Sequence, residues 1–304
     1  RHGRVGHCQA IKILMKNYII VTGGAGFVGS NLIEALLKNT NKKIISLDNY
    51  SSGVKKNQFK DKRVKYYRGD TSEIDKILSR YKKKIHTLFH FGEFARIFKS
   101  FKKFDDCFKS NSIGTQAVFK FCLDYKIKLI YSATSASLGN NGQDKNLSPY
   151  AFTKSKNLEL LENLKKWFNL KFEIVYFYNV YGPRHISTGE MATVVGIFEN
   201  QFKKNKPLTI VRPGNQTRRF THISDTINIC FEAWKKNKCA HYSISHKKSY
   251  SIMEVAKMFK HRVIYLNPRK GERYASALAN MSQNNKIIKK YGKIHLKDYI
   301  TSFI

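Results

Sequence analysis

Apolar residues recur along the first half of the chain in short runs, and the segments between these runs have helical spacing. The runs have the length of buried strands, and the intervening segments repeat apolar residues every three or four positions. Strands that alternate with helices predict βαβ units and a parallel sheet. The predicted strands are 17–22, 43–48, 64–67, 86–91, 127–134 and 172–178, and the predicted helices are 27–38, 101–125 and 150–168.

The regular alternation weakens after Gly182 and Pro183. We therefore expect an α/β fold, with a Rossmann-type doubly wound parallel sheet and a smaller C-terminal α/β region. Short helices are predicted there at 193–203, 225–235 and 251–259. The expected division is an N-terminal extension at 1–14 with Met15 as the natural start, a main domain at 15–182, and a second, partly interleaved region at 183–304.

The composition is that of a globular protein, with 42% hydrophobic and 13% aromatic residues. No apolar run approaches the roughly 20 residues that span a bilayer. The five cysteines lie far apart, without the spacing of a zinc site, which favours a reducing compartment. We therefore expect a cytoplasmic protein that has no metal site and no membrane contact.

The formal net charge of +35 allows two interpretations. In the first, a basic surface binds nucleic acid or an anionic membrane. In the second, the composition has drifted toward lysine and the charge has no binding role. The lysines are scattered over every segment, which favours the second interpretation, so nucleic acid is not an expected partner. The charge would still attract an anionic substrate at low ionic strength.

Three glycines follow the first predicted strand with the spacing G-x-x-G-x-x-G. Gly23, Gly26 and Gly29 lie at a strand-to-helix turn, where glycine lets the backbone approach a pyrophosphate and the helix start offers free N–H groups. A glycine turn alone is not specific, but the strand before it and the helix after it are the context that a dinucleotide site requires. Phe27 and Val28 belong to the same predicted site.

Asp48 ends the second predicted strand, 19 residues after Gly29. A carboxylate at this place accepts hydrogen bonds from both ribose hydroxyls and repels a 2′-phosphate, so it favours NAD over NADP. The nearby Lys55 and Lys56 leave NADP open as the alternative.

Tyr150 and Lys154 form a Y-x-x-x-K motif at the start of a predicted helix. A spacing of four residues places both side chains on one face of the helix. The lysine ammonium lowers the pKa of the phenol, so the tyrosine can remove a hydroxyl proton near neutral pH. Thr134 ends the preceding strand, at the sheet edge that faces a ligand crevice, and its hydroxyl can hold the same substrate oxygen.

Taken in order, these motifs resemble the extended short-chain dehydrogenase/reductases. The stretches 179–184 (NVYGPR) and 218–220 (RRF) fit the same pattern. Within that superfamily the chain looks most like the NAD-dependent epimerase/dehydratase family and its UDP-glucose 4-epimerase group. The resemblance implies NAD as cofactor, a UDP-hexose as substrate, and a homodimer formed through the helices 101–125 and 150–168.

The resemblance also implies roles for further residues. Asp70 would contact the adenine and Asn111 would lie along the cofactor. Ser276 would lie beside the C2 substituent of the sugar when positions are counted from Gly271, and Ala277 when they are counted back from Ala279 and Asn280. Both side chains are small and would leave room for an N-acetyl group, so an N-acetyl sugar is an alternative substrate. The substrate residues implied are Thr134, Asn179, Arg218, Arg269 and Ser276, and the cofactor residues are Gly23, Gly26, Phe27, Val28, Gly29, Asp48, Asn49, Asp70, Thr71, Phe91, Gly92, Asn111, Tyr150 and Lys154.

The implied reaction is 4-epimerisation: Tyr150 takes the proton of the 4-hydroxyl, hydride passes to NAD, and the 4-keto sugar turns over before hydride returns. Dehydratases of the superfamily follow the catalytic threonine with Asp-Glu, whereas Ser135 and Ala136 follow Thr134, so dehydration and decarboxylation are disfavoured. An NADP-dependent keto-sugar reductase and a non-enzymatic cofactor or nucleic-acid binder are the alternatives. Departures from the family pattern that leave the sugar open are Glu93, Phe94, Leu138 and Tyr176.

Overall fold

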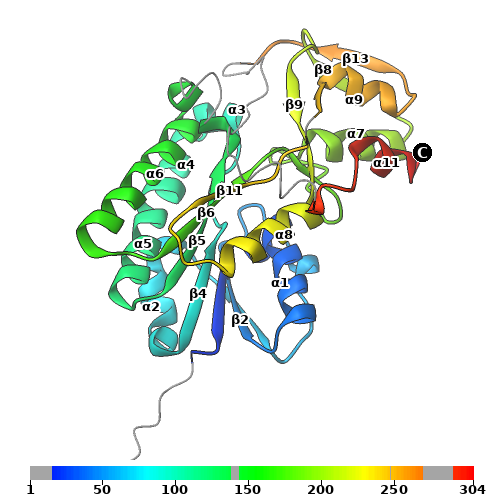
Figure 1. Cartoon of the computed structure of the whole chain (residues 1–304). Coiled ribbons are helices and arrows are strands. Elements are labelled where there is room, and N and C mark those ends of the chain that lie inside the picture. Colours follow the sequence, from blue (N-terminus) through cyan, green and yellow to red (C-terminus); the bar gives the residue numbers. More distant parts are fainter. Residues whose placement is uncertain (1–15, 138–143, 247, 270–289) are drawn as a thin grey trace, which may run out of the picture.

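The sheet that the alternation predicts is present and has seven strands. The structure, a computed structural model, describes residues 16–137, 144–246, 248–269 and 290–304. All neighbouring strands of this sheet pair in parallel, which confirms the Rossmann-type α/β fold (Figure 1). In spatial order they are β11 (His241–Ser243), β6 (Phe172–Phe177), β5 (Lys128–Thr134), β4 (Ile85–His90), β1 (Tyr18–Thr22), β2 (Lys43–Asp48) and β3 (Val64–Arg68).

Helices cover both faces of this sheet, because its central strands are apolar on both sides. In β1, Ile19 and Val21 belong to one core cluster and Ile20 to the other, and all three side chains are fully buried. One face is covered by α2 (Ile74–Leu78), α5 (Thr115–Asp124) and α6 (Pro149–Phe168), and the other by α1 (Phe27–Asn39) and α8 (Ile223–Trp234) (Figure 1).

The prediction of one helix over 101–125 is wrong in its bounds and in its continuity. The helix breaks at Lys103, whose φ of −116° and ψ of 55° leave the helical region. A wider π-helical turn follows and brings Gly114 so close to Thr71 that an added Cβ would lie 2.3 Å from the threonine hydroxyl. Tertiary contacts therefore override the helical pattern here. The observed pieces are α3 (Ile97–Lys102), α4 (Phe104–Phe108), η4 (Lys109–Gly114) and α5.

A smaller group of elements from the second half of the chain lies beside the carboxyl ends of the strands, at the upper right of Figure 1. Its core contains Phe198, Leu208 and Phe259, which are buried. Two elements of the second half, α8 and β11, belong instead to the main sheet and its cover. The smaller group comprises α7 (Val194–Lys203), α9 (Ile252–Met258), α11 (Leu296–Thr301) and the strand pairs β7 (Val180–Tyr181) with β10 (Thr221–His222), β8 (Leu208–Val211) with β13 (Val263–Leu266), and β9 (Thr217–Arg219) with β12 (Ser249–Ser251).

Neither a membrane span nor a metal cluster occurs in the described ranges. No helix there has the length and apolar composition needed to cross a bilayer. No group of three or more His, Cys, Asp or Glu side chains there could hold a metal ion. Short 3₁₀ helices complete the described secondary structure: η1 (Lys55–Asn57), η2 (Thr71–Glu73), η3 (Ser79–Lys84) and η5 (Ser135–Ser137).

Asp225, in the first turn of α8, is a buried carboxylate. Its loss of hydration raises its pKa from 3.8 to about 7. The folded protein therefore binds this proton more tightly than the unfolded chain does, and the free energy of unfolding falls as the pH rises through this range.

We expect Asp225→Asn to raise the free energy of unfolding at pH 8 by roughly 2–4 kcal/mol and to have little effect near pH 4. Urea unfolding at both pH values measures the difference. Asp298→Asn is the matched control, because Asp298 also lies in the first turn of a helix, α11, but is exposed. A gain at pH 8 that does not exceed that of the control would contradict the prediction.

Candidate active site

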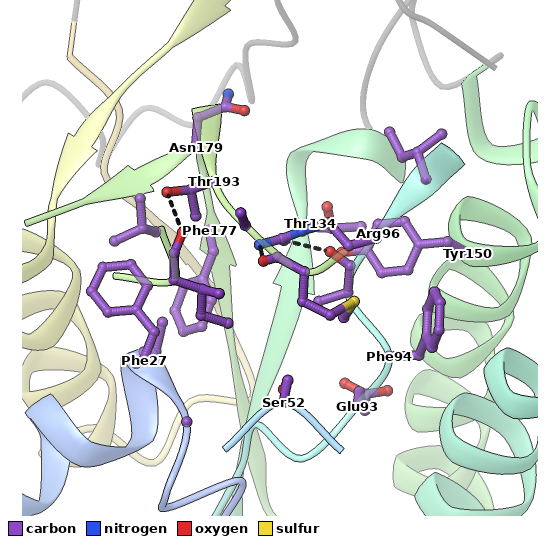
Figure 2. A pocket seen from close by; sticks show the side chains of 18 of the residues that line it. Phe27, Ser52, Glu93, Phe94, Arg96, Thr134, Tyr150, Phe177, Asn179 and Thr193 are labelled. Atoms are coloured by element: carbon purple, nitrogen blue, oxygen red, sulfur yellow. Dashed lines mark hydrogen bonds between the residues drawn. The ribbon is translucent and has the colours of Figure 1, made fainter. Parts of the chain in front are cut away.

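A cavity of about 500 Å³ opens at the carboxyl ends of β1, β4, β5 and β6, next to the smaller C-terminal group of elements (Figure 2). Ligand crevices of open parallel sheets lie at this edge. The structure therefore brings most of the predicted site residues together. Those that line the cavity are Gly23, Gly26, Phe27, Val28, Gly29, Asp48, Asn49, Thr71, Phe91, Gly92, Thr134, Tyr150, Lys154, Asn179, Arg218 and Arg269.

The glycine loop between β1 and α1 allows close backbone contacts that a side chain would prevent. Gly23 has a φ of +69°, and a Cβ added to it would lie 2.9 Å from the backbone of Gly92. A Cβ on Gly29 would lie 2.2 Å from the carbonyl oxygen of Gly23. Gly26 is the N-cap of α1 and has no side chain to cap it, so the first N–H groups of this helix stay available for a phosphate.

The loops that follow β1 and β4 are tied together by Thr22, the last residue of β1. Its Oγ1 accepts hydrogen bonds from the backbone N–H groups of Phe91 at 3.1 Å and Gly92 at 3.0 Å. The Nδ1 of His90 lies 2.7 Å from the same oxygen. Burial lowers the pKa of His90 to about 4, so the imidazole is neutral at pH 7. These contacts hold the glycine loop and the loop after β4 in one position.

Asp48 gives the cavity a carboxylate at the end of β2. One of its oxygens accepts from the backbone N–H of Ala25 at 2.9 Å and the other from Tyr50 at 2.8 Å. Each carboxylate oxygen has two acceptor sites, so capacity remains for ribose hydroxyls. Burial raises the pKa of Asp48, and the backbone hydrogen bonds oppose that change. The glycine cradle and this carboxylate together fit the dinucleotide NAD.

Tyr150 and Thr134 face the cavity from two elements that meet there (Figure 2). Tyr150 lies in the first turn of α6, where Ser148 caps the helix by accepting from Ala151 N–H at 3.1 Å. The N–H of Tyr150 donates to Ser100 Oγ on α3 at 3.2 Å. Thr134 ends β5, and its hydroxyl oxygen accepts from Ala136 N–H at 3.1 Å. The main chain around both hydroxyls is therefore held by local hydrogen bonds.

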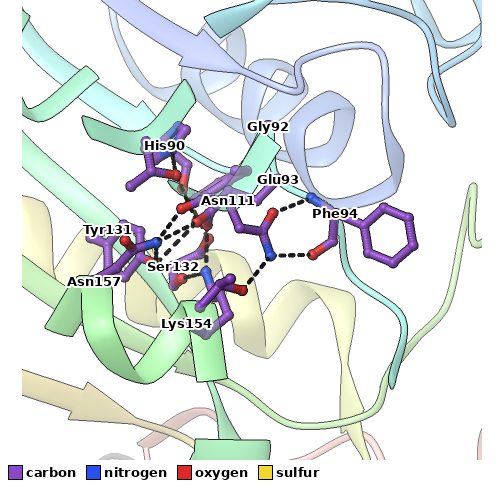
Figure 3. Close-up of polar contacts among 12 residues, drawn as sticks. His90, Gly92, Glu93, Phe94, Asn111, Tyr131, Ser132, Lys154 and Asn157 are labelled. Carbon is purple, nitrogen blue, oxygen red and sulfur yellow. Dashed lines mark hydrogen bonds and ion pairs between the residues drawn. The ribbon is translucent and has the colours of Figure 1, made fainter. Parts of the chain in front are cut away.

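Lys154 lies one turn after Tyr150 and is buried, with an ammonium group that donates to the Glu93 carboxylate and to the carbonyl oxygen of Ser132 (Figure 3). Its Nζ also lies 4.3 Å from the centre of the Tyr131 ring. Burial lowers the pKa of Lys154, and the charge of Glu93 opposes that change. The lysine therefore has a buried partner that the Y-x-x-x-K motif does not predict.

Glu93 is the centre of a buried polar network beneath the cavity (Figure 3). Its Oε1 accepts from Thr115 Oγ1 at 2.9 Å, Tyr131 Oη at 3.0 Å and Asn157 Nδ2 at 3.3 Å, while Oε2 accepts from Lys154. A buried carboxylate needs such partners because an unpaired one loses its hydration without compensation. In the sequence, the only signal of this network was the departure of Glu93 from the family pattern.

Two predicted cofactor residues do not line the cavity. Asn111 is fully buried, and its side chain accepts from the N–H of Phe94 at 2.7 Å and donates to the carbonyl of Phe94 at 3.0 Å. These two hydrogen bonds fix the backbone of the loop after β4 at Phe94. Asp70 caps η2 by accepting from Ser72 N–H at 3.1 Å, between Gly69 and Thr71, which do line the cavity.

Of the positions that were expected to shape the sugar pocket, Glu93 and Phe94 line the cavity. Tyr176 does not: it is buried in the core, with its hydroxyl 3.0 Å from Nδ1 of His241. Leu138 and Ser276 lie outside the described residues.

Basic and amide side chains also line the cavity. Asn179 donates from Nδ2 to the carbonyl of Arg219 at 2.9 Å, and Arg218 donates from Nη1 to the carbonyl of Thr217 at 2.8 Å. The guanidinium of Arg269 lies 5.5 Å from the centre of the Phe98 ring. Guanidinium groups suit the oxygens of a diphosphate. Arg96, which also lines the cavity, was not among the predicted site residues.

The chain is similar to proteins of one family along most of its length. Residues 19–245 match the model of the NAD dependent epimerase/dehydratase family. An ADP-L-glycero-D-manno-heptose-6-epimerase from Brachyspira hyodysenteriae is 32% identical over 259 residues, which cover 80% of each protein. The crystal structure of a UDP-glucose 4-epimerase from Thermotoga maritima with UDP-glucose is 25% identical, with a TM-score of 0.83 and coverage of 93% of this chain and 96% of that one.

A second solved structure is a variant of the UDP-glucuronic acid 4-epimerase from Bacillus cereus, in complex with a fluorinated UDP-glucuronic acid and NAD. It is 27% identical, with a TM-score of 0.82, and the match covers 94% of this chain and 100% of that one. These relatives are named for different sugars, so similarity alone does not specify the substrate.

The geometry of the glycine loop leads to a test of NAD binding. Gly23→Ala would force a side chain to within 2.9 Å of the Gly92 backbone at a positive φ. We expect this variant to bind NAD at least about tenfold more weakly, a loss of about 1.4 kcal/mol, as measured by calorimetric titration. Gly189→Ala is the control, because Gly189 has a φ of +76° but no atom within 4 Å of an added Cβ. Equal losses in both variants would contradict the prediction.

Proposed function

The chain belongs to the NAD dependent epimerase/dehydratase family, and from this premise we propose that it is a UDP-hexose 4-epimerase that interconverts UDP-glucose and UDP-galactose. The observation that supports this choice most directly is the pair Thr134 and Tyr150 in the same cavity as the glycine loop, with Ser135 and Ala136 after the threonine. The similarity to a UDP-glucose 4-epimerase structure agrees with it.

The position of the carboxylates supports epimerisation over loss of water. Of the described residues that line the cavity, Asp48 and Glu93 are the carboxylates. Asp48 lies at the end of β2 beside the glycine loop, and Glu93 is bound by Lys154. Neither is the acidic neighbour that would protonate a leaving hydroxyl next to Thr134. The described residues of the cavity therefore include a hydroxyl pair, Thr134 and Tyr150, for proton exchange at one sugar oxygen. They do not include the acid and base that the loss of water would need beside Thr134.

The described residues of the cavity have separate tasks in the proposed reaction. When bound in the glycine loop, NAD supplies the chemistry of removing and returning a hydride at C4 of the sugar. Tyr150 would take the proton of the 4-hydroxyl and return it after the sugar has turned over, because a phenol that ionises can act as a general base. Thr134 would hydrogen-bond to the same oxygen. Arg218 and Arg269 would hold the diphosphate.

We also propose that the protein is a homodimer formed through α4 and α6. Phe104, Phe108 and Phe152 form an aromatic row there, with ring centres 4.4 Å and 6.3 Å apart. Phe104 is 51% exposed and Phe152 is 39% exposed, and Ile113 on the neighbouring turn is 60% exposed. A group of exposed apolar side chains on adjacent helices is typical of a protein interface, and these helices form the outer layer at the left of Figure 1.

The substrate is tested by incubating the purified protein, without added cofactor, with UDP-glucose, UDP-N-acetylglucosamine, UDP-glucuronic acid and an ADP-heptose. We expect conversion of UDP-glucose to UDP-galactose, and a loss of about 10²–10⁴ in kcat for Tyr150→Phe, because the variant lacks the general base. Tyr125→Phe is the control, since Tyr125 lies at the far end of α5 and bonds Asp75. Absence of product from every sugar, or a strict need for added reduced cofactor, would contradict the proposal.

The dimer has a separate test. Replacing Phe104 and Phe152 together by Asp puts two charges into the proposed interface, and we expect a monomer by light scattering after size-exclusion chromatography. Ile264→Asp is the control because Ile264 is similarly exposed, at 48%, but lies on β13. A wild-type protein that is already monomeric at micromolar concentration would exclude this interface.

A further inference from the structure

Lysines that are scattered along the sequence come together at one edge of the main sheet. Each of the seven strands is preceded, within three residues, by at least one lysine. Because the strands are parallel, their amino ends share one edge, away from the cavity and toward the bottom of Figure 1. We call this region the basic edge, and its lysines nearest to each strand are Lys16, Lys42, Lys62, Lys84, Lys126, Lys171 and Lys238.

Hydrogen bonds and charge effects show that lysines from different strands are neighbours there. The Nζ of Lys16 donates to the carbonyl of Lys126 at 3.1 Å, and the Nζ of Lys42 donates to the carbonyl of Lys16 at 3.4 Å. Burial lowers the pKa of His86, on β4, and three lysine charges lower it further, those of Lys42, Lys128 and Lys16. The starts of β1, β2 and β5 therefore bring positive charge to one imidazole on β4.

A general enrichment in lysine would not produce the difference between the two edges of the sheet. The whole chain has 56 Lys and Arg against 21 Asp and Glu. In the three positions before each strand the acidic residue is Asp61, which Arg63 binds at 2.9 Å. The three described positions after each strand hold no lysine or arginine and include Asp70 and Glu93. The excess positive charge is therefore concentrated at the amino edge.

Carboxylates close to the basic edge offset little of its charge. Asp124, at the end of α5, pairs with Lys120 at 2.7 Å. Glu173 is buried and accepts hydrogen bonds from the backbone N–H groups of Lys238 at 2.7 Å and Ala240 at 3.0 Å. Both acids thus have partners of their own, and the exposed ammonium groups of the edge remain available to an external anion.

Two large aromatic side chains are exposed at the same end of the molecule. Trp167 and Phe168, the last residues of α6, are 62% and 58% exposed. The next residue, Asn169, accepts a hydrogen bond from Nζ of Lys171 at 2.8 Å, which ties the end of the helix to the start of β6. Tryptophan beside lysine is typical of a membrane–water interface, where the ring enters the headgroup region and the ammonium groups meet lipid phosphates.

We propose that the basic edge, together with Trp167 and Phe168, binds the surface of an anionic lipid bilayer. The cations of the edge are nearly all lysines, which suit a charged membrane surface, whereas nucleic-acid recognition relies more on the forked donors of arginine. No helix in the described ranges can cross a bilayer, so the contact is peripheral. The cavity lies at the opposite edge of the sheet and is not covered. The inference goes beyond the proposed function and does not depend on it.

Cosedimentation of the full chain with vesicles tests this surface. We expect binding to vesicles of equal parts phosphatidylglycerol and phosphatidylcholine at low ionic strength, weaker binding at high ionic strength, and none to pure phosphatidylcholine. Replacing Lys82, Lys83 and Lys84 together by Gln should weaken binding at least about tenfold. The matched control replaces Lys204, Lys206 and Lys260 by Gln, which removes the same charge from exposed positions in the smaller group of elements and should weaken binding much less.

Tryptophan fluorescence separates insertion of the aromatic pair from simple charge attraction. Trp167 and Trp234 are the two tryptophans of the chain, and Trp234 is half-buried with its Nε1 bonded to Thr87 at 2.9 Å. Lipids with brominated chains should quench Trp167 in the bound protein, and Trp167→Phe should abolish that quenching. Trp167 lies 15 residues after Phe152, about 22 Å along the helix, so the variant should remain a dimer if the wild type is one.

Absence of binding to the anionic vesicles at low ionic strength would overturn the inference, as would equal weakening by the two lysine triples. Binding without quenching would overturn the role of the aromatic pair. Binding to polyuridylate that depends on Lys82, Lys83 and Lys84, without binding to vesicles, would overturn the membrane and assign the edge to nucleic acid. Circular dichroism of each variant checks its fold. None of these measurements involves a sugar, so their outcome is independent of the test for epimerase activity.

Discussion

The close backbone approach between the loops after β1 and β4 is the constraint on which the site depends. Gly23 and Gly92 meet with no room for a side chain between them, and the hydroxyl of Thr22 holds the second loop to the end of β1. One of these loops forms the cofactor cradle and the other contributes Glu93 and Arg96 to the site. A change in either loop therefore moves both the cofactor site and the polar network beneath the catalytic residues.

Much of this arrangement could be predicted from the sequence because the relevant signals are local. Strand β2 has the bounds that its apolar run predicts, and the glycine spacing, Asp48, Thr134 and Tyr150 each follow from their place at a strand end or helix start. Parallel strands bring such ends to one edge, so these residues meet without further information. The close approach of Gly114 to Thr71 in the π-helical turn was not predictable in this way, because it joins two segments that are 43 residues apart in the sequence.

The partners of the buried polar and charged side chains could also not be predicted from the sequence. The partners of Glu93 come from α5, β5 and α6, at positions 22, 38, 61 and 64 residues further along the chain. Nothing in the spacing of Thr115, Tyr131, Lys154 and Asn157 indicates that they share one carboxylate. Asn111 shows the same limit, since its motif fits a cofactor residue but its amide bonds hold Phe94. Long-range polar contacts of this kind arise only from the packed tertiary structure.

The edge strand β11 has a consequence for how the protein reaches its folded state. This strand pairs with β6 although 63 residues separate the end of β6 from the start of β11, and the segment between them includes α7, α8 and Arg218. The sheet cannot be completed during synthesis until residue 243 has left the ribosome, so β6 has an open edge until then. Because the paired strands are far apart in the sequence, the contact order is high and the parallel sheet is expected to form slowly. A chain that stops before β11 would leave the edge of β6 open to pairing with other chains.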